Sequence, residues 1–157
     1  RRGYNMTISY SKKFGVIFLA PVFAWLVMSM GWTDAALGVT KKGLRRVNDQ
    51  GAVEVSVVYL NPIQPAAGSH LSFEARLETH SVSLDAYKME KISFIRFDNS
   101  SKQPALGWFE PGGGGHHISG ILKFSGPVPD GTKSIKVIIE GIDGVQKRIF
   151  EWKLPIE

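Results

Sequence analysis

The chain has 157 residues and no cysteine, so disulfides, thiolate zinc sites, iron–sulfur clusters and c-type haem attachment are excluded. Its net charge of +5 is confined to one end. Residues 1–50 carry eight Lys and Arg against two Asp, whereas residues 51–157 carry eleven Lys and Arg against twelve Asp and Glu. A nucleic-acid-binding domain is expected to have a basic face, so the near-neutral second part argues against nucleic acid as a partner.

An apolar run from Phe14 to Trp32 follows Lys12 and Lys13 directly and contains no charged side chain. At about 1.5 Å per residue, a helix over this run reaches roughly the 30 Å of a bilayer's hydrocarbon core. We predict a transmembrane helix over 14–37, with residues 1–13 in the cytoplasm because positive charge abuts its start. A cleaved signal peptide is the alternative, but its apolar region is usually only about 7–15 residues long and its small-residue exit is poor here.

The next segment, residues 38–52, carries the basic cluster Lys41, Lys42, Arg45 and Arg46. We interpret it as a solvated basic linker outside the membrane. Contact of these charges with anionic lipid or with a partner is the alternative.

From Val53 onward, short runs rich in Val, Ile, Phe and Tyr are separated by Gly, Pro, Asn and Asp, which is the pattern of strands between turns. The alternation is clearest where Leu71, Phe73, Ala75 and Leu77 share one face. About seven strands in this length predict an all-β fold, an immunoglobulin-like antiparallel sandwich over 53–157. The predicted strands are 53–60, 71–79, 91–97, 106–109, 118–124, 134–140 and 146–154.

Residues 112–117, GGGGHH, are the most unusual local feature, and His80 lies in a second polar stretch, ETHSVSLD. Imidazole binds copper and zinc well, so His80, His116 and His117 form a candidate metal site, with Asp85 or Met89 as a fourth donor. The objection is that two adjacent strand residues point to opposite faces, so only one of the paired histidines would join His80. The competing interpretation is a structural turn, with its histidines bonded to backbone or to Asp85.

Two catalytic or nucleotide-binding interpretations are weaker. A hydrolase with Ser81 or Ser119 as nucleophile would use the same His and Asp residues, but no G-x-S-x-G elbow is present. The stretch 126–134, GPVPDGTKS, approaches a phosphate-binding loop, but Thr132 separates Gly131 from Lys133 and a strand follows instead of a helix. The sequence therefore predicts no nucleotide and no enzymatic activity.

Trp108 and Phe109 form an aromatic pair directly before Pro111 and the glycine run. Such a pair either closes the edge of the sandwich or is an exposed anchor for a protein partner.

In the stretches ETHSVSLDAY (78–87) and GWFEPGGGGHHISGILKF (107–124), the chain resembles a loosely defined group of uncharacterised bacterial exported or membrane-anchored β-domains. The resemblance covers about half of the predicted domain. It implies a bacterial, extracytoplasmic setting and no particular activity.

Together these observations predict a single-pass inner-membrane protein whose C-terminal domain lies in the periplasm. We expect a non-enzymatic accessory or interaction subunit of a larger membrane assembly, with membrane lipid and a membrane protein as partners and no cofactor. The alternative function is a periplasmic copper- or zinc-binding module that uses the three histidines.

Overall fold

The computed structural model describes residues 3, 38–65 and 70–156. The predicted transmembrane helix over 14–37 and all of the predicted cytoplasmic segment 1–13 except Gly3 lie outside these residues. Among the residues that are described, no helix is both long enough and apolar enough to cross a bilayer.

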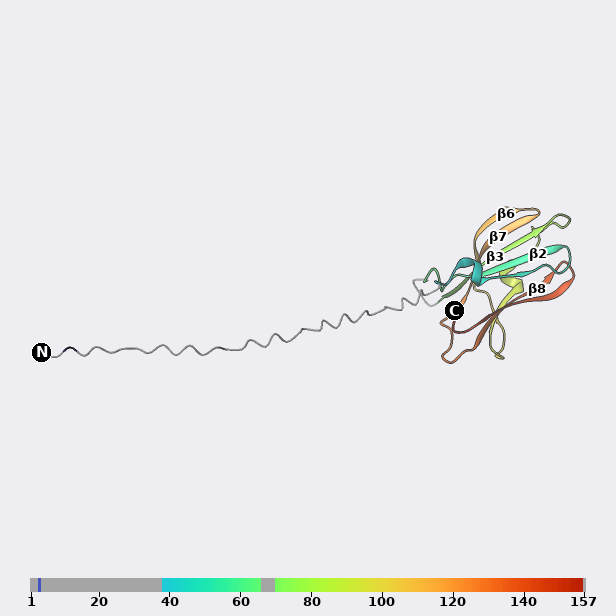
Figure 1. Cartoon of the computed structure of the whole chain (residues 1–157). Coiled ribbons are helices and arrows are strands. Elements are labelled where there is room, and N and C mark those ends of the chain that lie inside the picture. The colour runs from blue at the N-terminus through green and yellow to red at the C-terminus, as the bar shows by residue number, and fades with distance from the viewer. Residues whose placement is uncertain (1–2, 4–37, 66–69, 157) are drawn as a thin grey trace. The chain divides into compact units, whose positions relative to one another are not determined.

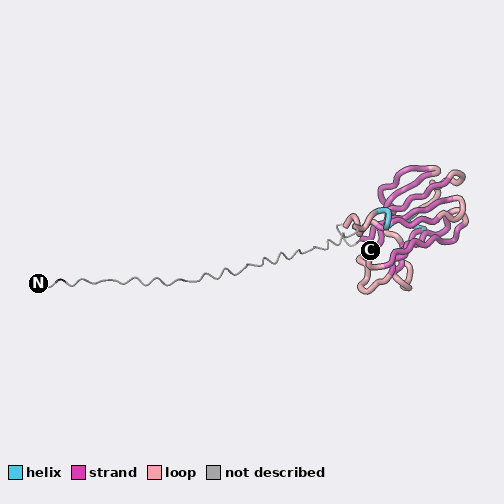
Figure 2. The backbone as a smooth tube through the Cα atoms, in the orientation of Figure 1, coloured by secondary structure: helices cyan, strands magenta, loops and turns pink. Residues whose placement is uncertain are grey.

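The described part from residue 38 onward is mostly β-strand and forms two antiparallel sheets (Figures 1 and 2). One sheet has the strand order β1-β2-β3-β7-β6, and the other has the order β5-β4-β8-β9. Two four-residue helices accompany them, α1 (Lys41–Leu44) and α2 (Met89–Ile92). The strands are β1 (Arg45–Asn48), β2 (Val53–Tyr59), β3 (His70–Thr79), β4 (Ser93–Phe97), β5 (Gln103–Pro104), β6 (Gly107–Gly114), β7 (His117–Ser125), β8 (Ser134–Ile142) and β9 (Val145–Lys153).

The two sheets share one apolar core, as expected for a β-sandwich. The face of β3 that the alternation predicts as apolar is buried: Leu71 is 4% exposed, and Phe73, Ala75 and Leu77 are fully buried. From the other sheet, the Trp152 ring lies 5.2 Å from the Phe73 ring, centroid to centroid. Aromatic pairs of this kind add to the free energy that burial itself supplies.

Each of the seven predicted strands overlaps an observed strand, and the β8–β9 hairpin turns at Asp143-Gly144 as predicted. The fourth strand differs most, since β6 continues to Gly114 instead of ending at residue 109. Its register with β7 shifts between Phe109 and Gly112, where Glu110 has a φ of 52°. This is a β-bulge, and pairing resumes beyond it.

The structure differs from the predicted linker over 38–52. Residues 45–48 pair with β2, and Leu44 is only 1% exposed within the core. The Trp152 indole Nε1 donates a hydrogen bond of 2.7 Å to the Leu44 carbonyl. Strand pairing with β2, one buried apolar side chain and one buried hydrogen bond therefore hold the basic segment in the domain.

Arg148 is fully buried. Its guanidinium donates to the side-chain oxygen of Asn48 at 3.1 Å and to the carbonyl oxygens of Gln50, Val53 and Ile142 at 2.6, 3.3 and 2.8 Å. Burial lowers the pKa of Arg148, and the nearby Asp143 opposes this change. The side chain joins the β1–β2 hairpin to the β8–β9 hairpin.

We expect Arg148→Met to lower the free energy of unfolding by about 3 kcal/mol, because buried carbonyl oxygens lose their donor and each costs roughly 1–3 kcal/mol when unpaired. Chemical denaturation followed by circular dichroism measures the change. Lys153→Met is the matched control, because this exposed cation lies on the same strand and should change the value by less than about 0.5 kcal/mol. Equal losses in the two variants would contradict the role of Arg148.

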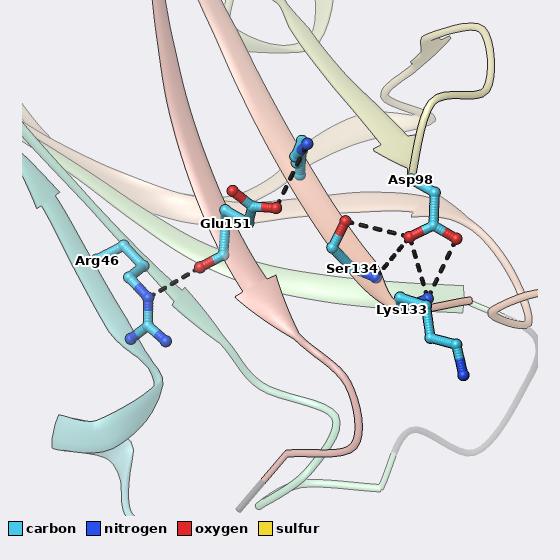
Figure 3. A network of polar contacts seen from close by, with 6 residues as sticks. Arg46, Asp98, Lys133, Ser134 and Glu151 are labelled. Carbon is cyan, nitrogen blue, oxygen red and sulfur yellow. Dashed lines mark hydrogen bonds and ion pairs between the residues drawn. The ribbon is translucent and has the colours of Figure 1, made fainter. Parts of the chain in front are cut away.

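Asp98 makes a second polar junction, at the end of β4 (Figure 3). Its carboxylate accepts hydrogen bonds from the backbone N–H groups of Lys133 and Ser134 at 3.0 and 2.7 Å, and from the Ser134 hydroxyl at 3.2 Å. Its own N–H donates to the Ser134 carbonyl. These bonds, that of Lys133 first, lower the pKa of Asp98 below its ordinary value of 3.8.

A depressed folded pKa adds stability at pH values above the ordinary 3.8 and loses it as the pH falls through the folded pKa. We expect Asp98→Asn to be less stable than the natural chain near pH 7, with the gap closing below about pH 3.8. Asparagine also tolerates the φ of 46° found here. Denaturation curves over this pH range measure the gap, with Asp130→Asn as the exposed control. A gap that does not depend on pH would exclude the carboxylate charge as its source.

Candidate functional site

The two polar stretches that the sequence analysis singled out lie against each other. The Thr79 N–H donates to the His116 carbonyl at 3.0 Å, and the Leu84 N–H donates to the Gly115 carbonyl at 2.7 Å. In return, the Gly115 N–H donates to the Asp85 carboxylate at 2.8 Å. The segment after β3 and the turn between β6 and β7 therefore form one hydrogen-bonded unit, which we call the loop pair (residues 79–85 and 113–117).

Glycine is required at one position in this unit. Gly113 has a φ of 81°, and a Cβ atom there would collide with the His117 carbonyl oxygen. The close approach of β6 to β7 explains this part of the glycine run without any ligand.

The candidate metal ligands have different environments. Nδ1 of His116 donates to the Val82 carbonyl at 3.1 Å. The rings of His80 and His117 lie 6.4 Å apart, centroid to centroid, at an angle of 81°, and both side chains are exposed. The structure therefore brings His80 and His117 together, while His116, which lies in the turn before β7, is bonded to Val82.

Asp85 uses one carboxylate oxygen for Gly115, while the other accepts from the Ser83 hydroxyl at 3.4 Å. Met89 is 1% exposed and belongs to the core, so it is not a fourth donor beside the histidines. In residues 38–65 and 70–156, no group of three or more His, Asp or Glu side chains is arranged to hold a metal ion. The same part of the chain shows no hydrogen bond from Ser81 or Ser119 to a histidine.

Trp108 and Phe109 occupy the edge strand β6 in different ways. Trp108 is partly buried, and its ring lies on Gly120 of β7, where an added Cβ atom would approach it to 2.6 Å. Phe109 is 41% exposed and its neighbour Leu106 is 55% exposed. Lys123 places its Nζ 4.6 Å from the centroid of the Phe109 ring. Trp108 therefore closes the edge, while Phe109 and Leu106 form an exposed apolar surface, which we call the β6 edge surface.

A hollow of about 330 Å³ lies beside this strand, next to the loop pair. Its wall combines apolar side chains with one carboxylate, that of Asp85. The lining residues include Leu84, Asp85, Tyr87, Trp108, Pro111 and Ile118.

The basic cluster is largely engaged within the domain. Lys41 pairs with Glu74 at 2.6 Å, and Arg45 pairs with Glu54 at 3.6 Å. Arg46 donates to the Glu151 carbonyl at 3.0 Å (Figure 3). It also lies over the Trp152 ring, 5.6 Å from the centroid. These contacts reduce the charge that remains for anionic lipid.

The sequence predicts Trp108 and Phe109 as a pair without separate roles. Their roles differ because adjacent strand residues point to opposite faces of a sheet. Trp108 lies opposite Leu122, and Phe109 lies opposite Ile121. Leu106 belongs to the predicted strand 106–109 but is not predicted as a binding residue, and the observed strand begins one residue later, at Gly107.

Comparisons of the chain with protein-family models, with curated proteins and with solved structures found no match.

Proposed function

We propose that this chain is a membrane-anchored, non-enzymatic subunit whose periplasmic β-sandwich binds another membrane protein through the β6 edge surface. The observation that carries the proposal is the exposed pair Phe109 and Leu106, at the start of the edge strand β6. This strand is held in place by Trp108, which packs on Gly120, and by the loop pair. Exposed aromatic side chains on a rigid support lose little entropy on binding and are typical anchors of interfaces.

The predicted apolar helix over 14–37 supports anchoring in the inner membrane, and Lys12 and Lys13 support the orientation with the C-terminal domain in the periplasm. The absence of cysteine means that this domain is held by packing and polar junctions alone. Core residues from both sheets, together with buried Arg148, supply that support.

The strand order supports an immunoglobulin-like topology. Constant-type immunoglobulin domains have sheets ordered A-B-E-D and C-F-G. The orders β2-β3-β7-β6 and β4-β8-β9 become the same two sequences when these seven strands are lettered along the chain, and β1 and β5 are additions at the edges. Domains with this architecture commonly serve recognition, and fold-level analogy alone identifies no ligand.

The bulge at Glu110-Pro111 also suits a side-chain interface. A bulge and a proline hinder pairing of another strand with an edge, so the β6 edge surface is protected from adding a strand of a second chain. Phe109 instead offers an exposed aromatic side chain, and the separate hollow lined by Trp108 and Pro111 offers a depression of side-chain size beside the same strand. We infer a partner surface with an apolar side chain for the hollow and an acidic group near Lys123.

A photoreactive residue placed at position 109 should cross-link to a specific membrane protein in intact cells. Position 47 is the matched control, because Val47 is 53% exposed on the opposite edge of the same sheet. Membranes are washed with alkaline carbonate before analysis, and the product is identified by mass spectrometry. We expect a discrete adduct from position 109 that stays with the washed membranes, and Leu106→Asp should reduce it at least tenfold.

Equal adducts from positions 109 and 47, or none from either, would contradict the β6 edge surface. Release of the chain by the carbonate wash would contradict the membrane anchor. The cross-link at position 109 would still test the β6 edge surface.

A second candidate function is binding of copper or zinc, favoured by the approach of His80 and His117. Two imidazoles supply part of a coordination sphere, and water or a partner group would complete it. Metal and proton compete for the same imidazole nitrogen, so metal affinity should fall in acid.

If the pair binds metal, zinc or copper at about a hundred times its dissociation constant should stabilise the fold by roughly 2.7 kcal/mol. Replacing His80 or His117 by Gln should remove this effect, which a thermal melting curve measures. His70→Gln is the control, since His70 lies at the far end of β3. An unmoved midpoint with both metals would exclude the site.

A further inference from the structure

The outer face of the four-stranded sheet carries a repeated pattern. On β8 the outward side chains are Lys136, Ile138 and Glu140, and on β9 they are Lys147, Ile149 and Glu151. Both strands therefore present Lys-x-Ile-x-Glu. The inward residues between them, such as Val137 and Phe150, are fully buried or nearly so.

The antiparallel register turns this repeat into a checkerboard of charge. Lys136 lies opposite Glu151, Ile138 opposite Ile149, and Glu140 opposite Lys147. Lys136 and Glu151 approach to 3.4 Å. Each of these four charged residues thus has an opposite charge across from it on the other strand and another at the far end of its own strand. Along each strand an isoleucine lies between the two charges.

The isoleucine pair is part of a longer apolar row across the sheet. Phe94 of β4 lies opposite Ile138, and Pro104 of β5 lies opposite Phe94. Ile149 is 43% exposed, whereas Ile138 is 5% exposed although it does not belong to the core between the sheets. On β8 and β9 the row Pro104, Phe94, Ile138 and Ile149 lies between charged side chains on both sides, whereas on β4 the residues two positions from Phe94 are Arg96, opposite Lys136, and Ile92.

We propose that this face binds a second copy of the same chain, with the twofold axis running along the apolar row. Rotation about that axis keeps every strand over its own counterpart and reverses the direction of the strands. Phe94, Ile138 and Ile149 then lie over the same residues of the other copy, and the apolar row is covered along its whole length. This is the self-complementarity that a twofold interface requires.

The charges fit the same operation. Each residue two positions before the row is placed over the residue two positions after it, so Lys136 faces Glu140 of the other copy and Lys147 faces Glu151. All four contacts join opposite charges. Complementary charge fixes the register and orientation of an interface even where each exposed pair adds little affinity.

Lys102 covers the Phe94 ring, with Nζ 3.9 Å from the ring centroid, and binds Glu140 at 2.8 Å, so its flexible side chain must swing aside for Phe94 to meet its counterpart. Lys147, Ile149 and Glu151 on β9 are exposed. The proposal goes beyond the proposed function, since it concerns the other sheet and does not involve Phe109.

The test uses the full chain in membranes and exploits its lack of cysteine. Ile149→Cys places one thiol next to its own counterpart across the axis, and Val47→Cys places a somewhat more exposed thiol on the other sheet. Mild oxidation followed by non-reducing electrophoresis measures the dimer. We expect at least tenfold more cross-linked dimer from Ile149→Cys than from Val47→Cys. Equal yields would overturn the proposal.

Charge reversal then tests the register. Lys147→Glu in the Ile149→Cys background sets two acidic side chains against each other, and Glu151→Lys in that background sets two lysines against each other. Each variant alone should lose most of its dimer. Co-expression of the two should restore it, because in the mixed dimer each acidic side chain at position 147 or 151 of one copy again faces a lysine of the other. Arg76→Glu, on the outer part of the other sheet, is the control and should leave the yield unchanged.

Single reversals that cross-link as well as the parent, or a mixture that stays as low as its components, would refute this interface. Neither result would bear on the adduct expected at position 109.

Discussion

Arg148 carries its charge into the space between two hairpins, and its hydrogen bonds end on oxygen atoms of both. A buried cation is costly unless its donors are paired. The guanidinium and these oxygens therefore fix each other's positions. Asp143 adds to the junction, since its carboxylate accepts from the Ala52 N–H at 2.7 Å while its own N–H donates to the Tyr87 hydroxyl. The turn between β1 and β2 is thereby fixed to the turn between β8 and β9.

The ordering of the basic segment follows from this junction. Once the β1–β2 hairpin is fixed beside β9, Leu44 is brought to the Trp152 indole, and Arg46 reaches both the Trp152 ring and the Glu151 carbonyl. Lys41 and Arg45 then find carboxylates on β3 and β2. A segment with four basic residues around one leucine is thus part of the fold because of contacts made about a hundred residues later in the chain.

That dependence explains which features are predictable from the sequence. The alternation in 71–77 encodes its own buried face, and Asp143-Gly144 encodes its own turn, since both signals are local. The burial of Leu44 depends on Trp152, and β5 has only two residues, so neither has a local pattern. Arg148 does leave a signal: in the alternation from 146 to 152 it falls in register with Phe150 and Trp152, on the inward face.

The candidate site can likewise be predicted from the sequence only in part. His117, the first residue of β7, lies near His80, whereas His116 lies in the turn before this strand and bonds to Val82. The pairing of the two loops is set by Asp85 and by backbone groups that no composition pattern marks. Sequence alone identifies the residue types of a possible metal site, but tertiary hydrogen bonds decide which of them remain available.

The two proposed surfaces lie on different sheets and suit a chain that is held at a membrane. An exposed ion pair contributes about 0.2–1 kcal/mol, so four such pairs around a narrow apolar row give weak association in free solution. The membrane anchor proposed above would raise the effective concentration of two neighbouring copies toward the millimolar range, where weak contacts are populated. The β8–β9 face then needs correct register more than high affinity, which is what alternating charge provides. The β6 edge surface stays open in such a dimer, because the twofold axis lies on the opposite sheet, and each copy keeps Phe109 available for another protein.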